Sequence, residues 1–85
     1  MKFNIQATHI APIYQQLKDG IEEMISNNSL TRGQVLPKAS EIARINNIPE
    51  SEVVRAYHEL VIAGTLSKSQ RKNLFGDNVV EYTIN

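Results

Sequence analysis

The sequence contains no cysteine and no tryptophan, and its nine basic side chains are balanced by nine acidic ones. Without cysteine the chain cannot form disulfides, thiolate zinc sites or a cysteine nucleophile, so nothing requires an oxidising compartment and we expect a cytoplasmic protein. No apolar run approaches the about 20 residues of a membrane helix, and no signal-peptide pattern precedes the first polar residues. The zero net charge argues mildly against a nucleic-acid binder, because phosphate neutralisation usually requires a basic excess.

Motifs that would indicate catalysis or metal binding are also missing. The chain has no glycine-rich phosphate loop, no metal-ligand spacing and no nucleophile–base set. Its two histidines, His9 and His58, lie far apart in the sequence, which disfavours a triad or a histidine metal site. A length of 85 residues leaves room for one domain with one small core. We therefore expect a single domain that is not an enzyme and needs no cofactor or metal.

Three helices are predicted in the middle of the chain. Apolar residues recur at helical spacing from Ile13 to Ile25, directly after Pro12, whose missing N–H costs nothing at a helix start. A short second helix is expected over residues 38–46. A third helix is expected from Pro49 to Ala63, with Gly64 closing it at the position that favours a left-handed backbone.

Extended segments are predicted at both ends. Near the N-terminus, Phe3 and Ile5 alternate with polar residues, which is the period of a half-buried strand. The tail, residues 65–85, predicts a β-hairpin in which a polar, basic loop over residues 68–73 joins two strands, although the glycine-containing cluster at 76–78 is an alternative turn. The second strand carries three apolar residues on one face: Val80, Tyr82 and Ile84.

The order of these elements predicts a fold. Two helices joined by a short turn form a helix-turn-helix, and a hairpin directly after them forms a wing. The sequence therefore predicts an α+β winged helix-turn-helix, with three helices, a C-terminal β-hairpin wing and a short N-terminal strand. One domain covers residues 1–85, with an arm or strand at 1–10, the helical core at 12–64 and the wing at 65–85.

Three groups of residues in these helices resemble a known family. They are Pro12–Leu17, then Leu36-Pro37 followed by Glu41-Ile42-Ala43, and finally Val53–Leu60, which ends at Gly64. In this order and spacing they are similar to the GntR family of winged-helix repressors, and within it to the YtrA-type branch, which the leading strand also fits. The resemblance implies a small sequence-specific DNA-binding transcriptional regulator.

The resemblance also implies three places that grip DNA, namely the starts of the second and third helices and the wing. The outer stripe of the third helix would face the major groove, and the wing would reach phosphates or the minor groove. The residues expected to contact DNA are therefore Lys38, Ser40, Ser51, Arg55, His58, Lys68, Arg71 and Lys72. Structural alternatives stay open: Lys38 as a solvated lysine, Arg55 as an intrahelical partner of Glu52 or Glu59, and the basic wing as a solvated loop.

Two of these places depart from the family pattern. After the Leu-Pro pair the family commonly has a Ser-Glu-Arg run, and here the last of those positions is Ser40 instead of arginine. In the third helix, Glu50 and Glu52 occupy the first turn, and Val54 stands where arginine is common. The two acids favour the helix macrodipole by up to about 1 kcal/mol each, yet they repel phosphates. Glutamate can also accept a hydrogen bond from cytosine N4, so an acidic reading head is the competing interpretation.

The charge is unevenly distributed, and this shapes the expected partners. Residues 38–72 hold six basic and four acidic side chains, a sum of +2, so the remainder of the neutral chain carries −2. The expected partner is double-stranded DNA, with a homodimer formed through the N-terminal strand, the first helix or the last strand. The alternative is a winged helix that has lost base reading and binds a protein through its outer stripe, Ile62 included, or through the acidic first helix. No membrane partner is expected.

Overall fold

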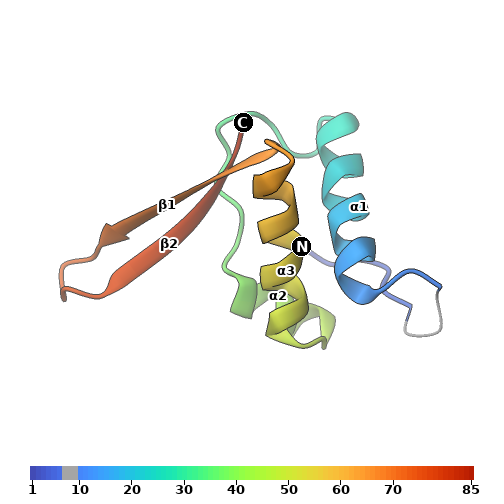
Figure 1. The fold of residues 1–85 in the computed structure, drawn as a ribbon, viewed down its shortest axis with the longest axis horizontal. Helices are drawn as coiled ribbons and strands as arrows, with labels where there is room; N and C mark the ends of the chain where they lie inside the picture. The colour runs from blue at the N-terminus through green and yellow to red at the C-terminus, as the bar shows by residue number, and fades with distance from the viewer. Residues whose placement is uncertain (7–9) are drawn as a thin grey trace.

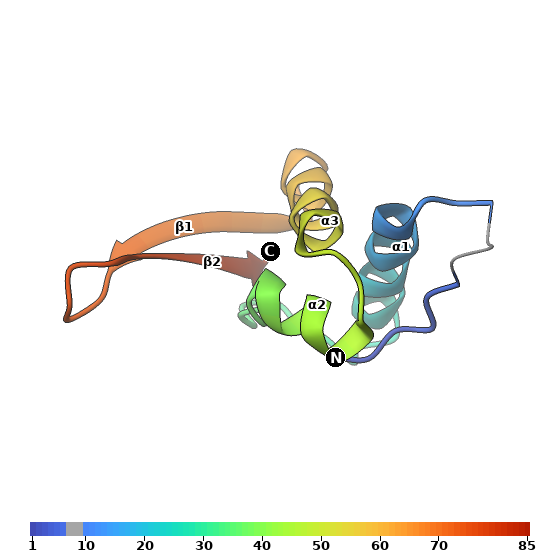
Figure 2. The ribbon, with the colours of Figure 1, turned by 90° about the horizontal axis from the view of Figure 1, so that it is seen from below.

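A computed structural model describes residues 1–6 and 10–85 and shows three helices followed by a two-stranded antiparallel sheet. The elements are α1 (Ile13–Ser26), α2 (Ala39–Asn46), α3 (Glu50–Ile62), β1 (Leu66–Lys72) and β2 (Asn78–Ile84). Helix α3 packs against both α1 and α2, and the hairpin projects sideways from the end of α3 (Figures 1 and 2). This confirms the predicted winged helix-turn-helix. No helix among the described residues is long and apolar enough to cross a membrane.

The helix ends follow from local chemistry. Pro12 is the N-cap of α1, and Asn47 ends α2 in the left-handed region at φ 53°. Gly64 ends α3 with φ +82°, while its N–H bonds to the Val61 carbonyl and the Thr65 N–H bonds to the Leu60 carbonyl. These two bonds form a Schellman motif, which requires a left-handed residue at the Gly64 position. The predicted closure of the third helix is thus confirmed.

The core is a single cluster centred on α3. Tyr57 is fully buried, and its ring packs against the Tyr82 ring with centroids 4.7 Å apart. Its hydroxyl donates a hydrogen bond of 2.7 Å to the carbonyl of Pro37, and burial raises the pKa of this hydroxyl well above its ordinary value. One side chain therefore ties α3 to β2 and to the connector before α2. The other buried residues are Leu17, Ile21, Leu30, Leu36, Ile42, Ala43, Val53, Ala56, Leu60, Leu66 and Ile84.

The prediction of a short N-terminal strand is wrong for the described residues. Residues 1–6 alternate between half-buried and exposed, as predicted, but they pair with no strand. Instead, the Phe3 N–H donates to the Asn46 side-chain oxygen at 2.7 Å, and the Asn46 amide donates back to the Met1 carbonyl at 3.0 Å. The segment is an extended arm that a helix side chain holds, because no sheet edge lies beside it. The part of the prediction that falls on residues 7–9 lies outside the described residues.

The prediction that residues 68–73 form a basic loop of the wing is also wrong. Residues 68–72 continue β1, with Lys68 opposite Tyr82 and Lys72 opposite Asn78. The turn lies at residues 73–77 and includes Gly76 and Asp77 of the alternative cluster at 76–78, whose last residue, Asn78, begins β2; Gly76 takes φ +81°. The polar side chains of β1 suit a strand because this ribbon projects from the body, and the hairpin is anchored at its base by the buried Leu66 and Ile84.

Candidate nucleic-acid interface

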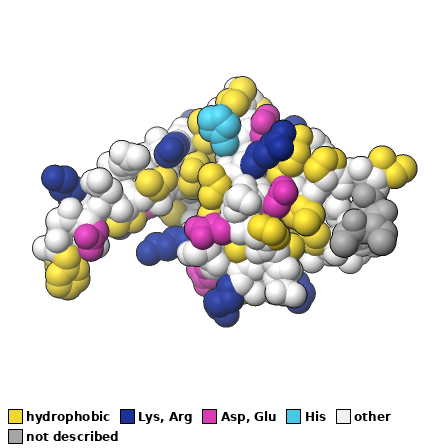
Figure 3. Space-filling view, turned by 60° about the horizontal axis from the view of Figure 1, so that its bottom comes forward, with side chains coloured by type: hydrophobic (Ala, Val, Ile, Leu, Met, Phe, Trp, Pro, Cys, Tyr) yellow, Lys and Arg dark blue, Asp and Glu magenta, His cyan; other side chains and the backbone are white. Residues whose placement is uncertain are grey.

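Helix α3 separates its buried and exposed stripes as the sequence predicts. Val53, Ala56, Tyr57 and Leu60 face the core, whereas Ser51, Val54, Arg55 and His58 are exposed. Figure 3 shows Lys and Arg side chains spread among acidic and apolar ones on the face it displays, and not gathered into one basic patch. The interface is therefore a mixed surface, in which individual positions matter more than the total charge.

Glu52 does not belong to this exposed stripe. Its carboxylate accepts a hydrogen bond of 3.1 Å from the backbone N–H of Tyr14, in the first turn of α1. Helix α1 begins at Pro12, which offers no side-chain cap of its own, so Glu52 satisfies a donor that the start of α1 leaves free. The charge of Glu52 also lies at the positive end of the α1 dipole. Of the two acids expected to repel phosphates, Glu50 and Glu52, Glu52 is therefore bonded to the backbone of α1.

Arg55 lies beside the same contact. Its guanidinium carbon is 3.9 Å from the centre of the Tyr14 ring, in cation–π geometry. Among the described residues, neither Glu52 nor Glu59 forms an ion pair with it, which contradicts the intrahelical pairing left open above. Arg55 keeps an exposed side chain that the Tyr14 ring orients without neutralising its charge.

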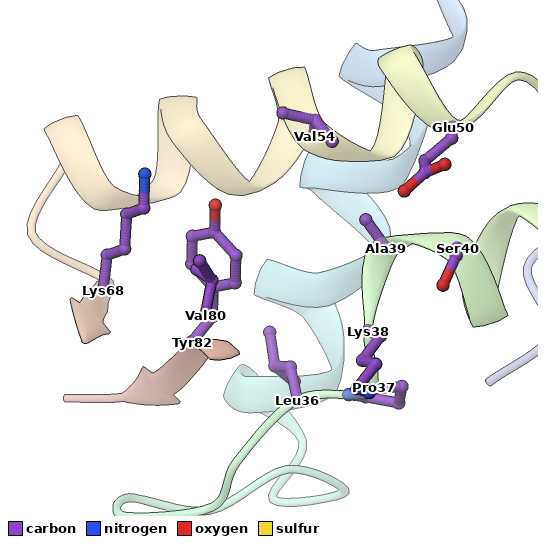
Figure 4. A pocket seen from close by; sticks show the side chains of 10 residues that line it. All are labelled: Leu36, Pro37, Lys38, Ala39, Ser40, Glu50, Val54, Lys68, Val80 and Tyr82. Atoms are coloured by element: carbon purple, nitrogen blue, oxygen red, sulfur yellow. The ribbon is translucent and has the colours of Figure 1, made fainter. Parts of the chain in front are cut away.

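The start of α2 and the base of the hairpin face each other across a cleft of about 300 Å³ (Figure 4). Lys38, the N-cap residue of α2, and Ser40 line it from one side, and Lys68 lines it from β1. Glu50 is exposed and also lines the cleft. The remaining lining is mainly apolar: Leu36, Pro37, Ala39, Val54, Val80 and Tyr82. Three of the predicted contact residues thus come together here.

The basic residues of the hairpin do not form one patch. Lys68 and Lys72 share the strand face that carries Tyr82, because alternate residues of a strand face the same side. Arg71 lies on the opposite face, where its Nε and Nη2 atoms both lie 2.8 Å from a carboxylate oxygen of Glu81. The arginine is thereby neutralised within the hairpin. The sequence prediction missed Glu81, since the partner becomes visible only when the turn is placed at 73–77 and the register is known.

The sequence prediction also missed the contact between Tyr14 and Glu52. The two residues are 38 positions apart, and no local pattern links them. The only available signal was the lack of a side-chain cap at Pro12, which implies that another element must supply an acceptor. Among the described residues, no group of three histidine or acidic side chains is placed to hold a metal ion.

Comparison with known proteins agrees with this geometry. A model of the family described as "Bacterial regulatory proteins, gntR family" matches residues 13–75. The chain belongs to the gntR family. The match runs from the first residue of α1 through the helix-turn-helix and β1 into the turn of the hairpin. It therefore covers most of the proposed interface of this gntR-family chain.

Two relatives extend the comparison. The gntR-family chain is 42% identical over 67 residues to the HTH-type transcriptional repressor STM4068 of Salmonella typhimurium, a match that covers 79% of the chain and 28% of that protein. It is also similar in structure to YtrA from Sulfolobus acidocaldarius, a GntR-family transcription factor, with a TM-score of 0.81 and 28% identity. That match covers 96% of the chain and 63% of YtrA. The chain thus spans less than two thirds of each relative.

Proposed function

We propose that this protein is a sequence-specific DNA-binding transcriptional regulator. In this proposal α3 lies in the major groove, the start of α2 contacts the phosphate backbone, and the hairpin reaches the flanking backbone or minor groove. The observation that carries the proposal is the position of Glu52, whose carboxylate caps α1 and leaves Glu50 as the one exposed acid beside Ser51, Arg55 and His58 on the described face of α3. The protein acts by binding and not by catalysis.

The residues divide by role. In this proposal Lys38 and Lys68, which line the same cleft, contact phosphates between the major and the minor groove, and Lys72 extends this contact along the hairpin. Phosphate contacts of this kind position the protein but do not read sequence. The exposed residues of α3 then read base edges. Ser40 replaces a larger basic side chain at the start of α2, so it adds a neutral hydrogen bond there at most.

Glu50 becomes the residue that sets sequence preference. It is exposed at the first turn of α3 and lines the cleft, so a phosphate close to it would be repelled. A carboxylate in the major groove can instead accept a hydrogen bond from cytosine N4. We therefore assign Glu50 a selective role, in which it disfavours most sequences and tolerates those that present cytosine opposite it.

The names of the relatives support the same function. One is a transcriptional repressor and the other a transcription factor. A homodimer on two half-sites and a cytoplasmic location complete the proposal. The competing function, a winged helix that binds only a protein, is favoured by the exposed Val54 and Ile62 of α3. Single exposed apolar side chains are ordinary on protein surfaces, so DNA binding is the better-supported function.

The first test measures the salt dependence of DNA binding. Fluorescence anisotropy with a random duplex and with the DNA upstream of the gene should show binding that weakens steeply as salt is raised. Replacing Lys68 and Lys72 together by alanine should lower the slope of log K against log[salt] by about 1.8, because each lost phosphate contact contributes about 0.9.

The matched control is Lys18→Ala, a single lysine of α1 that pairs with Glu22 at 3.9 Å, and it should leave the slope unchanged. The absence of binding to any duplex at low salt would refute the proposed function. A fall of about 0.9 in the slope of Lys18→Ala, half of that expected for the double variant, would show that the effect reflects total charge and not the hairpin.

A further inference from the structure

The free end of the hairpin carries two adjacent apolar side chains. Leu74 is 100% exposed and Phe75 is 87% exposed. Figure 3 shows apolar side chains gathered at the far end of the hairpin, away from the core. Isolated exposed apolar residues need no explanation, but a leucine and a phenylalanine together at a protruding apex offer apolar surface that nothing in the described chain covers. This apical pair, Leu74 and Phe75, played no part in the expected basic wing.

The turn holds the apical pair outward. The Asn73 side-chain oxygen accepts hydrogen bonds from the backbone N–H groups of Phe75 at 2.9 Å and Asp77 at 3.0 Å. The Asn73 N–H donates to the Asp77 carbonyl at 2.9 Å, and Gly76 provides the left-handed backbone at φ +81°. With the backbone bonded in this way, the two side chains do not fold back onto the ribbon. The apex is therefore preorganised, and ordering it on binding costs little conformational entropy.

The length of the hairpin places the apical pair at a defined distance from α3. Strand β1 has seven residues and so spans about 20 Å beyond the end of the helix. Half of one helical turn of B-DNA is about 17 Å, which is the axial offset between a major-groove site and the adjacent minor groove. With α3 in the major groove, a hairpin of this length is long enough to reach the flanking minor groove.

We propose that the apical pair is a wedge that enters the minor groove beside the α3 site and partly unstacks one base step. This inference rests on the proposed function. Apolar side chains inserted between base steps kink the duplex, and flexible pyrimidine–purine steps yield most easily. The charges favour DNA as the occupant: Arg71 and Glu81 pair with each other, which leaves Lys68 and Lys72, on one strand face, against the single acid Asp77 of the turn.

The wedge makes a prediction that charged contacts do not make. Burying apolar surface releases no counterions, so its contribution to affinity is independent of salt. The double variant Leu74→Ser with Phe75→Ser should bind a duplex about tenfold more weakly with an unchanged salt slope, since the gain from burial exceeds the cost of unstacking. Both side chains are exposed, so the variant should keep the thermal midpoint of the wild type.

The test places 2-aminopurine at a TA step flanking the site bound by the wild-type protein. The wild type should raise its fluorescence through unstacking, and the double variant should not. The matched control is Ile10→Ser, which removes a fully exposed apolar side chain outside the hairpin and should retain both affinity and fluorescence. Lys72→Ala should lower the salt slope while keeping the fluorescence increase.

The outcomes separate the two proposals. If the wild type binds no duplex, the proposed function fails and the wedge fails with it. If the wild type binds DNA with its salt-dependent slope but the double variant matches it in affinity and 2-aminopurine signal, the wedge alone is overturned. A change in oligomeric state by sedimentation in the double variant, with DNA affinity per subunit unchanged, would assign the apical pair to contact between copies and also overturn the wedge.

Discussion

Glu50 and Glu52 are two residues apart in α3, but their carboxylates have different surroundings. Glu50 lines an open cleft that Lys38 and Lys68 also line, and Glu52 accepts a backbone hydrogen bond from Tyr14. Identical charges at neighbouring positions therefore have different consequences. At the scale of the residue, the partner of a side chain decides whether its charge is available to a ligand.

This difference predicts unequal effects of two isosteric variants. Glu50→Gln should strengthen binding to random-sequence DNA severalfold, because it removes an exposed negative charge from the interface. Glu52→Gln should change the affinity for random-sequence DNA little. Glu52→Ala should lower the free energy of unfolding by about 1 kcal/mol, because it removes the cap of α1. Anisotropy and urea unfolding measure the two effects. Equal strengthening by the two glutamine variants would contradict the assigned roles.

At the scale of the element, the end of α3 adopts a backbone conformation that favours glycine. Gly64 has φ +82°, and a Cβ added there would meet no atom within 4 Å, so a substitution is disfavoured by the backbone conformation and not by a clash. The Schellman bonds at this residue set the direction in which the chain leaves α3. They therefore also determine where the hairpin projects.

We expect Gly64→Ala to destabilise the fold by about 1 kcal/mol or more, the cost of a left-handed residue with a Cβ atom. For a domain of this size that corresponds to a fall in thermal midpoint of about 4–8 °C. Gly64→Asn should lose less, because asparagine tolerates this conformation better. Calorimetry should give thermal midpoints that fall from the wild type to Gly64→Asn to Gly64→Ala. An alanine variant as stable as the wild type would show that the helix end had rearranged.

At the scale of the whole molecule, the N-terminal arm, residues 1–6, connects α1 and α2 by packing against both. The Phe3 ring lies against Gly20 in the middle of α1, where an added Cβ would meet Phe3 Cδ1 at 2.8 Å. Glycine inside a helix costs about 1 kcal/mol relative to alanine. Its presence at position 20 is explained by the close approach of the arm, which depends on bonds between Asn46 and residues 1–3.

A double-mutant cycle tests this packing. In a Phe3→Ala background, Gly20→Ala should stabilise the protein by about 0.5–1 kcal/mol through helix propensity. In the wild-type background the same change should give no gain or a loss, because the new methyl group displaces the Phe3 ring. Urea unfolding of the four proteins gives the coupling free energy. Additive effects of the two substitutions would show that the arm does not pack on α1 in solution.

Helix positions, the winged order of elements and the buried stripe of α3 could be predicted from the sequence, because periodicity, prolines and Gly64 act locally. The register of the hairpin, the neutralisation of Arg71 by Glu81 and the capping of α1 by Glu52 could not, because each joins residues that only the folded chain brings together. Apolar and polar residues alternate in the arm as they do in a strand, but no strand among the described residues lies beside it. The alternation by itself does not show whether a partner strand is present. The amino-acid sequence by itself thus determined the helices, the buried stripe of α3 and the family motif that they form. Only the tertiary structure decided which charges remain free for a partner, since a charge is neutralised through space and not along the chain.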